Sequence, residues 1–540
     1  MNKKSRLAAG VWFWLCFAAI IAYIGIARNY LDSDMASEMI LAKMCAEDNV
    51  IMSRNWYYST EIRLINMNLP MTFFFHFFQD FNLIRILSSI VMLGIVPLSF
   101  MYCCKQAGLK DSAVYFVSLL VLPFSKVFFQ FGLSGLHYSA YIMAVFFPIG
   151  FVFKINNPDV PAKKKILPWV MYLLFAVLMG LTTIRQLLVV YYPFALACFI
   201  IWLMDYLDTY GLRVLTLPEI KENIIKKWKQ NRYLCYFLTA CVGALVASVA
   251  YVGNVAILRD IYHFSSYDRI VYTNVDDFAR FSEVILGHAR VLGYEPGYQF
   301  LSIQGICNIL VIVFTCFMVW LTYRMVKNNK KYELKQRIIL IYFACAVIFN
   351  DFIFMFSDRC GDRYMLPYIL FFIVVLCIYV QREDIHISVR RLVYVAVMAL
   401  FIVNSACKYI EAISDEKDTS RNEAVEFLME NDYDFGYATY WNGNVLTELT
   451  NGKIEVRNVN IQNWDTLHCD LWLMKKDMEH RTSDHKVFIL LTQDQYEDNK
   501  KLSMFADKYK VYDNKGYEIF EYANTEELWS MAKPEEESNK

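Results

Sequence analysis

The chain has 540 residues, of which 57% are hydrophobic and 16% aromatic, while only 20% are charged. Soluble domains contain a smaller apolar share, so this composition, with a mean hydropathy of +0.30, predicts a protein that crosses a membrane many times. The formal net charge of zero argues against a nucleic-acid-binding protein.

Eleven apolar runs predict transmembrane helices and hence a polytopic α-helical membrane protein. The first run follows the basic stretch MNKKSRL and has no small-x-small cleavage site after it, so we expect a retained anchor. The predicted spans are 8–27, 82–101, 113–129, 136–153, 166–182, 187–204, 234–258, 300–323, 338–356, 364–380 and 392–411.

The distribution of basic residues predicts the orientation. With the amino terminus in the cytoplasm, the inner loops hold 24 Lys and Arg in 83 positions, and the outer loops hold 11 in 114. The positive-inside rule therefore favours a cytoplasmic amino terminus, and an odd number of spans places the carboxyl terminus outside.

Two long loops, 28–81 and 259–299, then lie on the outer side of the membrane, where we expect the functional site. The inner segment 205–233 contains EIKENIIKKWKQNR, which predicts an amphipathic surface helix.

Residues 412–530 predict a small α/β domain in the outer compartment. SRNEAVEFLME and DQYEDNKKLSMFAD are expected to be helices, FGYATY and KVFILLT strands, and YKVYDNKGYEIFEY two strands around a turn. The domain has no glycine-rich phosphate loop, which argues against a nucleotide site. Residues 531–540 form an acidic end that is expected to be disordered.

The 14 cysteines do not form a disulfide framework, because most lie inside apolar runs where cysteine behaves as a small hydrophobe. Cys45, Cys360 and Cys469 fall outside the predicted membrane, and a disulfide among them stays open.

The first outer loop opens with LDSDMASEMILAK, which sets Asp32, Asp34 and Glu38 just after a membrane span. This stretch predicts a helix capped by Ser33 or Asp34, but a cap needs only one side chain. A second carboxylate, partly desolvated at the interface, would suit general-base chemistry.

The same loop continues with NWYYSTEIRLINMNLP. The aromatic residues of this stretch are typical of an interfacial belt. Glu61 and Arg63 either pair with each other on the surface or serve the site.

Polar residues also mark the outer ends of several spans. Ionisable groups at membrane depth usually face a polar cavity or a partner, and a structural ion pair, such as Asp351 with Arg359, would account for any single one of them. A ring of basic groups could instead hold an anionic head group, because arginine grips phosphate oxygens in bidentate fashion. The residues concerned are Lys126, His137, Arg185, Asp351, Arg359 and Arg363.

This pattern resembles the GT-C glycosyltransferases, through LDSDMASEMILAK, STEIR and RYMLP together with the order of spans, loops and terminal domain. The most similar branch is the bacterial one resembling protein mannosyltransferases and the lipid A aminoarabinose transferase. The resemblance implies a polyprenyl-phosphate-sugar donor, an acceptor hydroxyl on a glycan, lipid or protein, and location in the plasma membrane of a bacterium. It leaves the use of a divalent metal open.

The resemblance also implies roles for particular residues. Asp34 or Asp32 would be the catalytic base, with Glu61 as an assisting acid. Many relatives have Asp-Glu at the start of this loop, whereas this chain has Asp-Ser-Asp. The choice between the two aspartates therefore stays open. The donor phosphate would be held by Arg185, Arg359, Arg363 and Lys126. The other substrate contacts would be Glu38, Arg63, His137 and Tyr364.

Three alternatives are weighed against this interpretation. A polysaccharide polymerase or ligase would favour a dominant central outer loop. A transporter of lipid-linked glycans would favour broken helices and mid-membrane charges, which the sequence lacks. A scaffold or a catalytically inactive relative also remains open.

Overall fold

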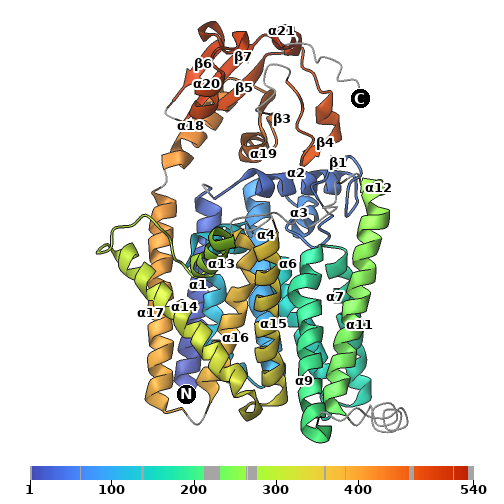
Figure 1. Cartoon of the computed structure of the whole chain (residues 1–540). Helices are drawn as coiled ribbons and strands as arrows, with labels where there is room; N and C mark the ends of the chain where they lie inside the picture. The colour runs from blue at the N-terminus through green and yellow to red at the C-terminus, as the bar shows by residue number, and fades with distance from the viewer. Residues whose placement is uncertain are drawn as a thin grey trace.

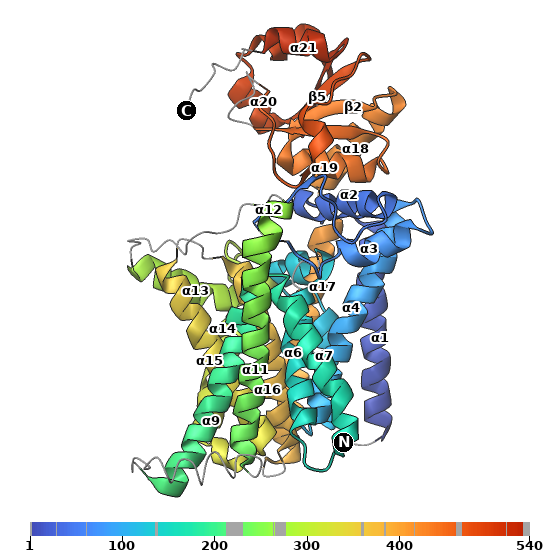
Figure 2. The same cartoon turned by 90° about the vertical axis from the view of Figure 1, so that its right-hand side faces the viewer.

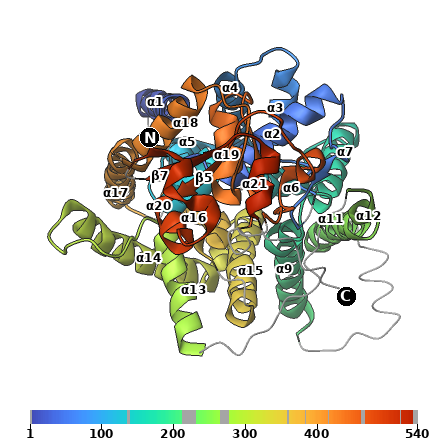
Figure 3. The same cartoon turned by 90° about the horizontal axis from the view of Figure 1, so that it is seen from above.

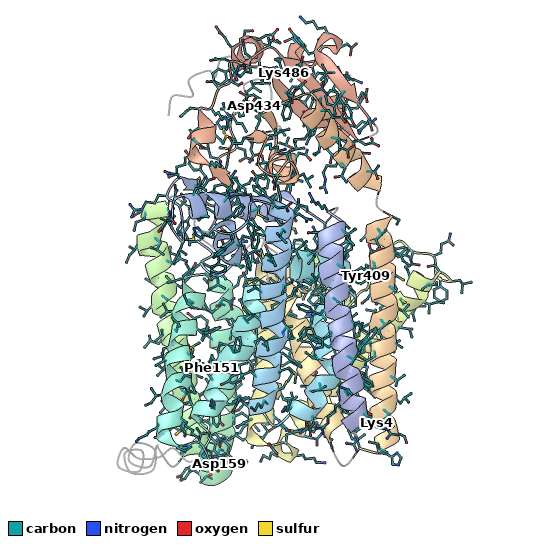
Figure 4. The ribbon with its side chains drawn as sticks, turned by 180° about the vertical axis from the view of Figure 1, so that it is seen from behind. Lys4, Phe151, Asp159, Tyr409, Asp434 and Lys486 are labelled. Carbon is teal, nitrogen blue, oxygen red and sulfur yellow. The ribbon has the colours of Figure 1, made fainter. Side chains whose placement is uncertain are left out.

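The computed structural model describes residues 3–28, 30–60, 62–135, 139–211, 231–262, 264, 277–357, 361–382, 385–414, 416–460, 467–514 and 516–532. It consists of a long helical bundle with a small sheet-containing domain on one end (Figure 1). We call the end of the bundle under this domain the domain-facing end. The labelled Lys4 and Asp159 lie at the opposite end, whereas Asp434 and Lys486 lie in the domain (Figure 4).

Within the described residues, eight helices are long and apolar enough to cross a membrane by length and composition. Helices suit this setting because each satisfies its backbone hydrogen bonds internally. Their main segments are α1 (Lys3–Ile26), α4 (Phe81–Gln106), α9 (Tyr192–Tyr210), α11 (Arg232–Gly253), α14 (Ile303–Lys327), α15 (Leu334–Phe356), α16 (Pro367–Gln381) and α17 (Ile387–Ile413). Short segments extend three of them: α8 (Ile184–Gln186) and η3 (Leu187–Tyr191), η5 (Asn254–Leu258) and α12 (Arg259–Tyr262), and η7 (Asp362–Met365).

The predicted class of polytopic helical membrane protein is confirmed, and each of the predicted spans overlaps a helical segment. The remaining three segments are shorter or interrupted. They are α5 (Lys110–Phe116) with η1 (Val117–Val121), α6 (Ser139–Ile155) and α7 (Ala162–Gly180). The predicted span 113–129 is broken because Leu122, just before Pro123, is extended, and η2 (Phe128–Ser134) follows the break. The orientation in the membrane stays a prediction.

The first long loop lies across the domain-facing end of the bundle as α2 (Ser33–Glu47) and α3 (Asn68–Phe75) (Figure 2). The predicted helix is present, but the predicted cap is wrong: Asp32, not Ser33 or Asp34, is the N-cap of α2. Its side chain accepts a hydrogen bond from the Met35 amide at 2.9 Å. Most of α2 is buried, because the bundle lies on one side of it and the domain on the other.

Two aromatic residues of this loop, Trp56 and Tyr58, are not part of a lipid-facing belt. Trp56 is fully buried and Tyr58 is nearly so. Strand β1 (Trp56–Tyr57) pairs antiparallel with β4 (Met474–Lys475) of the carboxyl-terminal domain. The loop and the domain thus share a two-stranded sheet.

The domain is built on a five-stranded sheet of order β3-β2-β5-β7-β6. Strands β3, β2 and β5 run parallel to one another, and β7 pairs antiparallel with both β5 and β6. Apolar side chains pack on both faces of the sheet. Its elements are α18 (Glu416–Glu430), β2 (Phe435–Thr439), α19 (Tyr440–Leu449), β3 (Glu455–Val459), β5 (Val487–Thr492), α20 (Gln493–Asn499), β6 (Lys510–Asp513), β7 (Tyr517–Tyr522) and α21 (Thr525–Met531).

Most predicted elements of the domain are present, with one correction. The stretch predicted as a single helix after β5 is helical only over α20, which a Thr492–Gln495 capping box starts; two short 3₁₀ turns follow it. Helix α19 and strand β3 were not predicted from the sequence.

Buried polar contacts join the domain to the bundle. Arg85 of α4 forms an ion pair with Glu448 of α19, with nitrogen–oxygen distances of 2.6 Å, and both side chains are buried. The same guanidinium donates to the Met35 carbonyl oxygen of α2 at 3.1 Å. Arg421 of α18 donates to the carbonyl oxygens of Leu31 and Arg28. The domain is therefore tied to α2 and α4 as well as to the end of α17.

In the second long loop, α13 (Asp277–Val291) packs against η7, and α13 and α14 extend to one side of the bundle (Figure 3). Gly287 permits the contact with η7: a Cβ at this position would lie 2.5 Å from Met365 Sδ and 3.3 Å from Asp362 Oδ1. The loop thereby abuts the segment that carries Arg363 and Tyr364.

Several predictions fall on residues outside the described ranges. They are most of the amphipathic helix in 205–233, nearly all of the acidic end at 531–540, and Cys360. Cys45 and Cys469 are both free thiols, so the structure contains no disulfide between them.

Candidate functional site

Asp34, in the first turn of α2, contacts the carboxyl-terminal domain directly. The Tyr440 hydroxyl donates a hydrogen bond to Asp34 Oδ1, and the Ser33 hydroxyl donates to the Tyr440 carbonyl oxygen. Burial, followed by the Asp34 charge, raises the pKa of Tyr440 well above its usual value. The Tyr440 hydroxyl therefore stays protonated and acts as a donor to the Asp34 carboxylate.

Asp34 faces a small polar cavity of about 70 Å³, which we call the Asp34 pocket. Glu38 is buried and accepts a hydrogen bond from Asn66 Nδ2. Arg63 supplies a positive charge to the lining. The lining residues are Asp34, Ser37, Glu38, Leu41, Met52, Trp56, Tyr58, Ser59, Arg63, Asn66, Asn68, Trp472 and Leu473.

The lining shows that the pocket lies between two distant parts of the chain. The loop after α1 provides every polar side chain, and Trp472 and Leu473 of the domain complete the wall. The sequence predictions Asp34, Glu38 and Arg63 therefore share one cavity. Tyr440, Asn66 and Trp472 were missed.

Asp32 lines a different cavity, although only one residue separates it from Asp34. This second cavity has a volume of about 370 Å³, and we call it the Lys408 cavity. It is lined by Tyr23, Tyr30, Leu31, Asp32, Lys126, Phe129, Gln130, Lys408, Glu411, Ala412 and Arg421. Because Asp32 also caps α2, it has a structural task that Asp34 lacks.

Arg185 and Arg363 meet at one tyrosine. The guanidinium carbon of Arg185 lies 3.9 Å from the centroid of the Tyr364 ring, and Arg363 Nη2 donates to the Tyr364 hydroxyl at 3.3 Å. Arg185 is positioned at the start of α8, where the Thr183 side chain accepts from its backbone amide. Two guanidinium groups on one aromatic ring repel each other, so an anion bound between them would be stabilised.

This arginine cluster lies at the domain-facing end of the bundle, close to the first loop. Thr182, three residues before Arg185, accepts a hydrogen bond from the Ile65 amide at 3.3 Å. Asn254 bridges the two segments by donating to the carbonyl oxygens of Leu181 and Ile62. The arginine cluster and the Asp34 pocket are thus joined through the 62–66 segment.

Two acidic side chains near the arginine cluster, Asp362 and Asp351, pair with residues of α13 rather than with Arg185 or Arg363. Asp362 accepts from Arg290 at 3.3 Å, and Asp351 bonds with His288 Nε2 at 3.0 Å. The His288 ring stacks on Tyr368 with centroids 5.1 Å apart. Asp351 therefore has a partner in α13, while Arg359, its predicted partner, lies outside the described residues.

Lys126 contacts a different group of residues from Arg185 and Arg363. Its side chain is 72% exposed and lines the Lys408 cavity, and its ammonium lies 4.0 Å from Glu295 Oε1. Glu61, His137 and Arg359 lie outside the described residues. Among the residues that the structure does describe, no three His, Cys, Asp or Glu side chains form a group that could hold a metal ion.

Two solved structures of ArnT from Cupriavidus metallidurans are similar to this chain. The structure bound to undecaprenyl phosphate has 12% sequence identity and a TM-score of 0.53, and the match covers 97% of this chain and 99% of that chain. The apo structure has 11% identity and a TM-score of 0.55, with 98% and 100% covered. No family model and no curated protein matches the sequence. The similarity therefore runs over both the bundle and the domain, and this chain has the same multi-pass membrane fold as these ArnT structures.

Proposed function

We propose that this protein is a membrane glycosyltransferase that moves a sugar from a polyprenyl-phosphate donor to an acceptor hydroxyl at the outer face of the membrane. One observation carries the proposal: the Asp34 pocket and the Arg185–Arg363 cluster are joined through the 62–66 segment at one end of a fold similar to that of ArnT. The ArnT structure with undecaprenyl phosphate supports a polyprenyl-phosphate ligand. The arrangement provides a carboxylate for the acceptor and cations for a phosphate.

The chemistry follows from these groups. Asp34 takes the proton of the acceptor hydroxyl as its oxygen forms a bond to the anomeric carbon of the donor sugar. The bond between that carbon and the phosphate oxygen breaks, and its electron pair leaves with the polyprenyl phosphate. Arg185 and Arg363 stabilise the charge on the departing phosphate through preorganised hydrogen-bond donors.

The remaining residues orient this exchange. Tyr440 holds one oxygen of Asp34 and leaves the other for the acceptor. Glu38, fixed by Asn66, and Arg63 provide polar contacts for sugar hydroxyls at the pocket wall. Because Trp472 and Leu473 close the same pocket, the domain would limit which acceptors reach Asp34.

The test uses the full chain in lipid nanodiscs, supplied with polyprenyl-monophosphate sugars and an extract of cell-envelope acceptors. Mass spectrometry follows the release of polyprenyl monophosphate. The proposal predicts release by the wild type and its loss in Asp34→Asn. The matched control is Asp48→Asn, which removes a carboxylate at the other end of α2 that accepts from Ser53 and does not line the pocket.

The same assay separates the alternatives. A polymerase or ligase that uses diphosphate-linked glycans would release polyprenyl diphosphate. A transporter would move the intact donor across the bilayer without releasing either product. Asp34→Asn releasing monophosphate as fast as Asp48→Asn would contradict the role of Asp34.

A further inference from the structure

A third cavity lies at the end of the bundle opposite to the domain, far from the candidate active site. It has a volume of about 480 Å³, and we call it the arginine pocket. It forms where the start of α1, the start of α5, the end of α16 and the start of α17 meet. The lining residues are Arg6, Asp111, Ser112, Tyr115, Val380, Gln381, Ile387, Arg390, Arg391 and Tyr394.

The lining carries an excess of positive charge. Arg6 pairs with Asp111 at 2.8 Å, which neutralises one guanidinium. Among the residues that the structure describes, the lining holds one carboxylate, Asp111, against the three guanidinium groups of Arg6, Arg390 and Arg391. Arg390 donates to the Val380 carbonyl oxygen at 3.4 Å, a contact that orients the guanidinium without cancelling its charge.

Two hydrogen-bond donors in the pocket wall have no acceptor among the described residues. Tyr115 is only 4% exposed, and its hydroxyl, which lies beside the Arg6 guanidinium, donates its proton to no described oxygen. The Arg390 Nε is likewise buried without a partner. A buried donor left unsatisfied is costly, so a ligand oxygen that accepts from both groups would be bound favourably.

The surroundings indicate where such a ligand comes from. The helices that supply Arg6 and Arg390 also present large apolar side chains outward: Leu7 is 71% exposed, Val11 53% and Leu392 68%. In a membrane these side chains contact acyl chains. A ligand that combines an anionic oxygen cluster with hydrocarbon tails therefore matches both the pocket and its rim, whereas a free phosphate matches the pocket alone.

We propose that the arginine pocket binds the phosphate of an anionic membrane phospholipid head group. Arg390 and Arg391 hold the phosphate oxygens, and Tyr115 donates its hydroxyl to the same group. Basic pockets between transmembrane helices bind anionic head groups by this combination of charge and hydrogen bonding. The site is separate from the donor site and does not depend on the proposed transfer reaction.

The test measures lipid binding to the delipidated full-length protein by native mass spectrometry. The probes are phosphatidylglycerol, phosphatidylcholine of the same chain length, and inorganic phosphate as a competitor. The double substitution Arg390→Gln with Arg391→Gln is expected to weaken phosphatidylglycerol binding by about tenfold or more. The matched control is Lys163→Gln with Lys164→Gln, which removes the same charge at the start of α7, outside the pocket.

The control is expected to bind phosphatidylglycerol as the wild type does, and wild-type phosphatidylcholine binding should be much weaker. Equal weakening by both double substitutions would overturn the site in favour of diffuse surface charge. Displacement of the lipid by an equal concentration of inorganic phosphate would overturn the lipid as the ligand. Tyr115→Phe, which keeps the ring and its packing, should also weaken binding; if it and the Arg390–Arg391 variant both bind normally, the proposal fails.

Discussion

The Tyr440 hydroxyl donates a hydrogen bond to Asp34 Oδ1, although the two residues are 406 positions apart in the chain. One belongs to the loop after the first span, and the other begins the first helix that follows a strand of the carboxyl-terminal domain. The carboxylate proposed as the base is therefore held by the domain that covers it. Helix α2 lies between the bundle and the domain. This position also places Asp34 and Asp32 in two different cavities.

Asp34 and Asp32 should respond differently to the same substitution. Asp34→Asn removes the proposed base and should lower transfer by about 10²–10⁴-fold. Asp32→Asn should leave transfer within severalfold of wild type, since asparagine is as good an N-cap as aspartate. The measurement is the rate of polyprenyl monophosphate release at matched protein levels. Equal losses for the two variants would show that the cavities do not separate their roles.

Tyr440→Phe tests whether the domain contributes to the site. Losing a hydrogen bond to a charged acceptor should lower transfer by about ten- to a hundredfold. Tyr433→Phe is the matched control, because Tyr433 donates to Glu521 within the same domain and away from the pocket. Transfer by Tyr433→Phe should stay near wild type, and an equal fall in both would point to general destabilisation of the domain.

Parts of this arrangement could be predicted from the sequence and parts could not. The spans, the helix after Asp32 and several strands follow from local patterns of apolar residues and caps. The partners of Asp34 and Arg85 could not be predicted, because Tyr440 and Glu448 lie in a helix that carries no local signal for contacts several hundred residues away. The expected cap at Ser33 or Asp34 was wrong because neighbouring polar residues are equally suited to capping by sequence alone.

The basic residues illustrate the same limit. Arg185 and Arg363 were singled out by their positions at span ends, and the structure brings both to Tyr364. Lys126 shares that sequence feature, yet it lines the Lys408 cavity, because the break at Pro123 redirects the chain before η2. The position of a residue along a predicted span indicates its depth in the membrane. It does not indicate which side of the helix bundle the side chain faces.

The arginine cluster should determine affinity for polyprenyl phosphate. Arg363→Gln removes a charged donor and should weaken binding by about tenfold or more. Arg324→Gln, an exposed arginine at the end of α14, removes the same charge outside the cluster and should have little effect. Binding to the protein in nanodiscs can be followed by native mass spectrometry. Similar affinities for the two variants would show that the cluster does not contact the phosphate.

The Arg85–Glu448 pair should hold the domain on the bundle. Glu448→Gln leaves Arg85 buried without its counter-ion, and such changes cost about 3–5 kcal/mol. Hydrogen exchange should then rise in α2 and α19, while the interior of the bundle stays protected. The double substitution Arg85→Met with Glu448→Leu should restore much of the protection. Unchanged exchange in Glu448→Gln would show that other contacts suffice to dock the domain.

Alkaline pH should loosen the sheet shared by the loop and the domain. The hydrogen bond from the Tyr57 hydroxyl to Glu479 is the main cause that raises the pKa of Tyr57 to about 12. A pKa raised by folding contributes stability that is full below the usual value near 10 and is lost as the pH rises through about 12. The protection factors of the β1 and β4 amides, which are corrected for base-catalysed intrinsic exchange, should fall over this range in the wild type. The protection factors of Tyr57→Phe should stay constant, and an identical fall in that variant would assign the effect to another group.

Mass spectrometry of envelope glycans tests the central claim most directly. Cells that express the wild type are compared with cells that express Asp34→Asn or Asp48→Asn at equal protein levels. The account predicts a sugar modification that is present with the wild type and with Asp48→Asn and is missing with Asp34→Asn. Identical glycans with the wild type and with Asp34→Asn would contradict it.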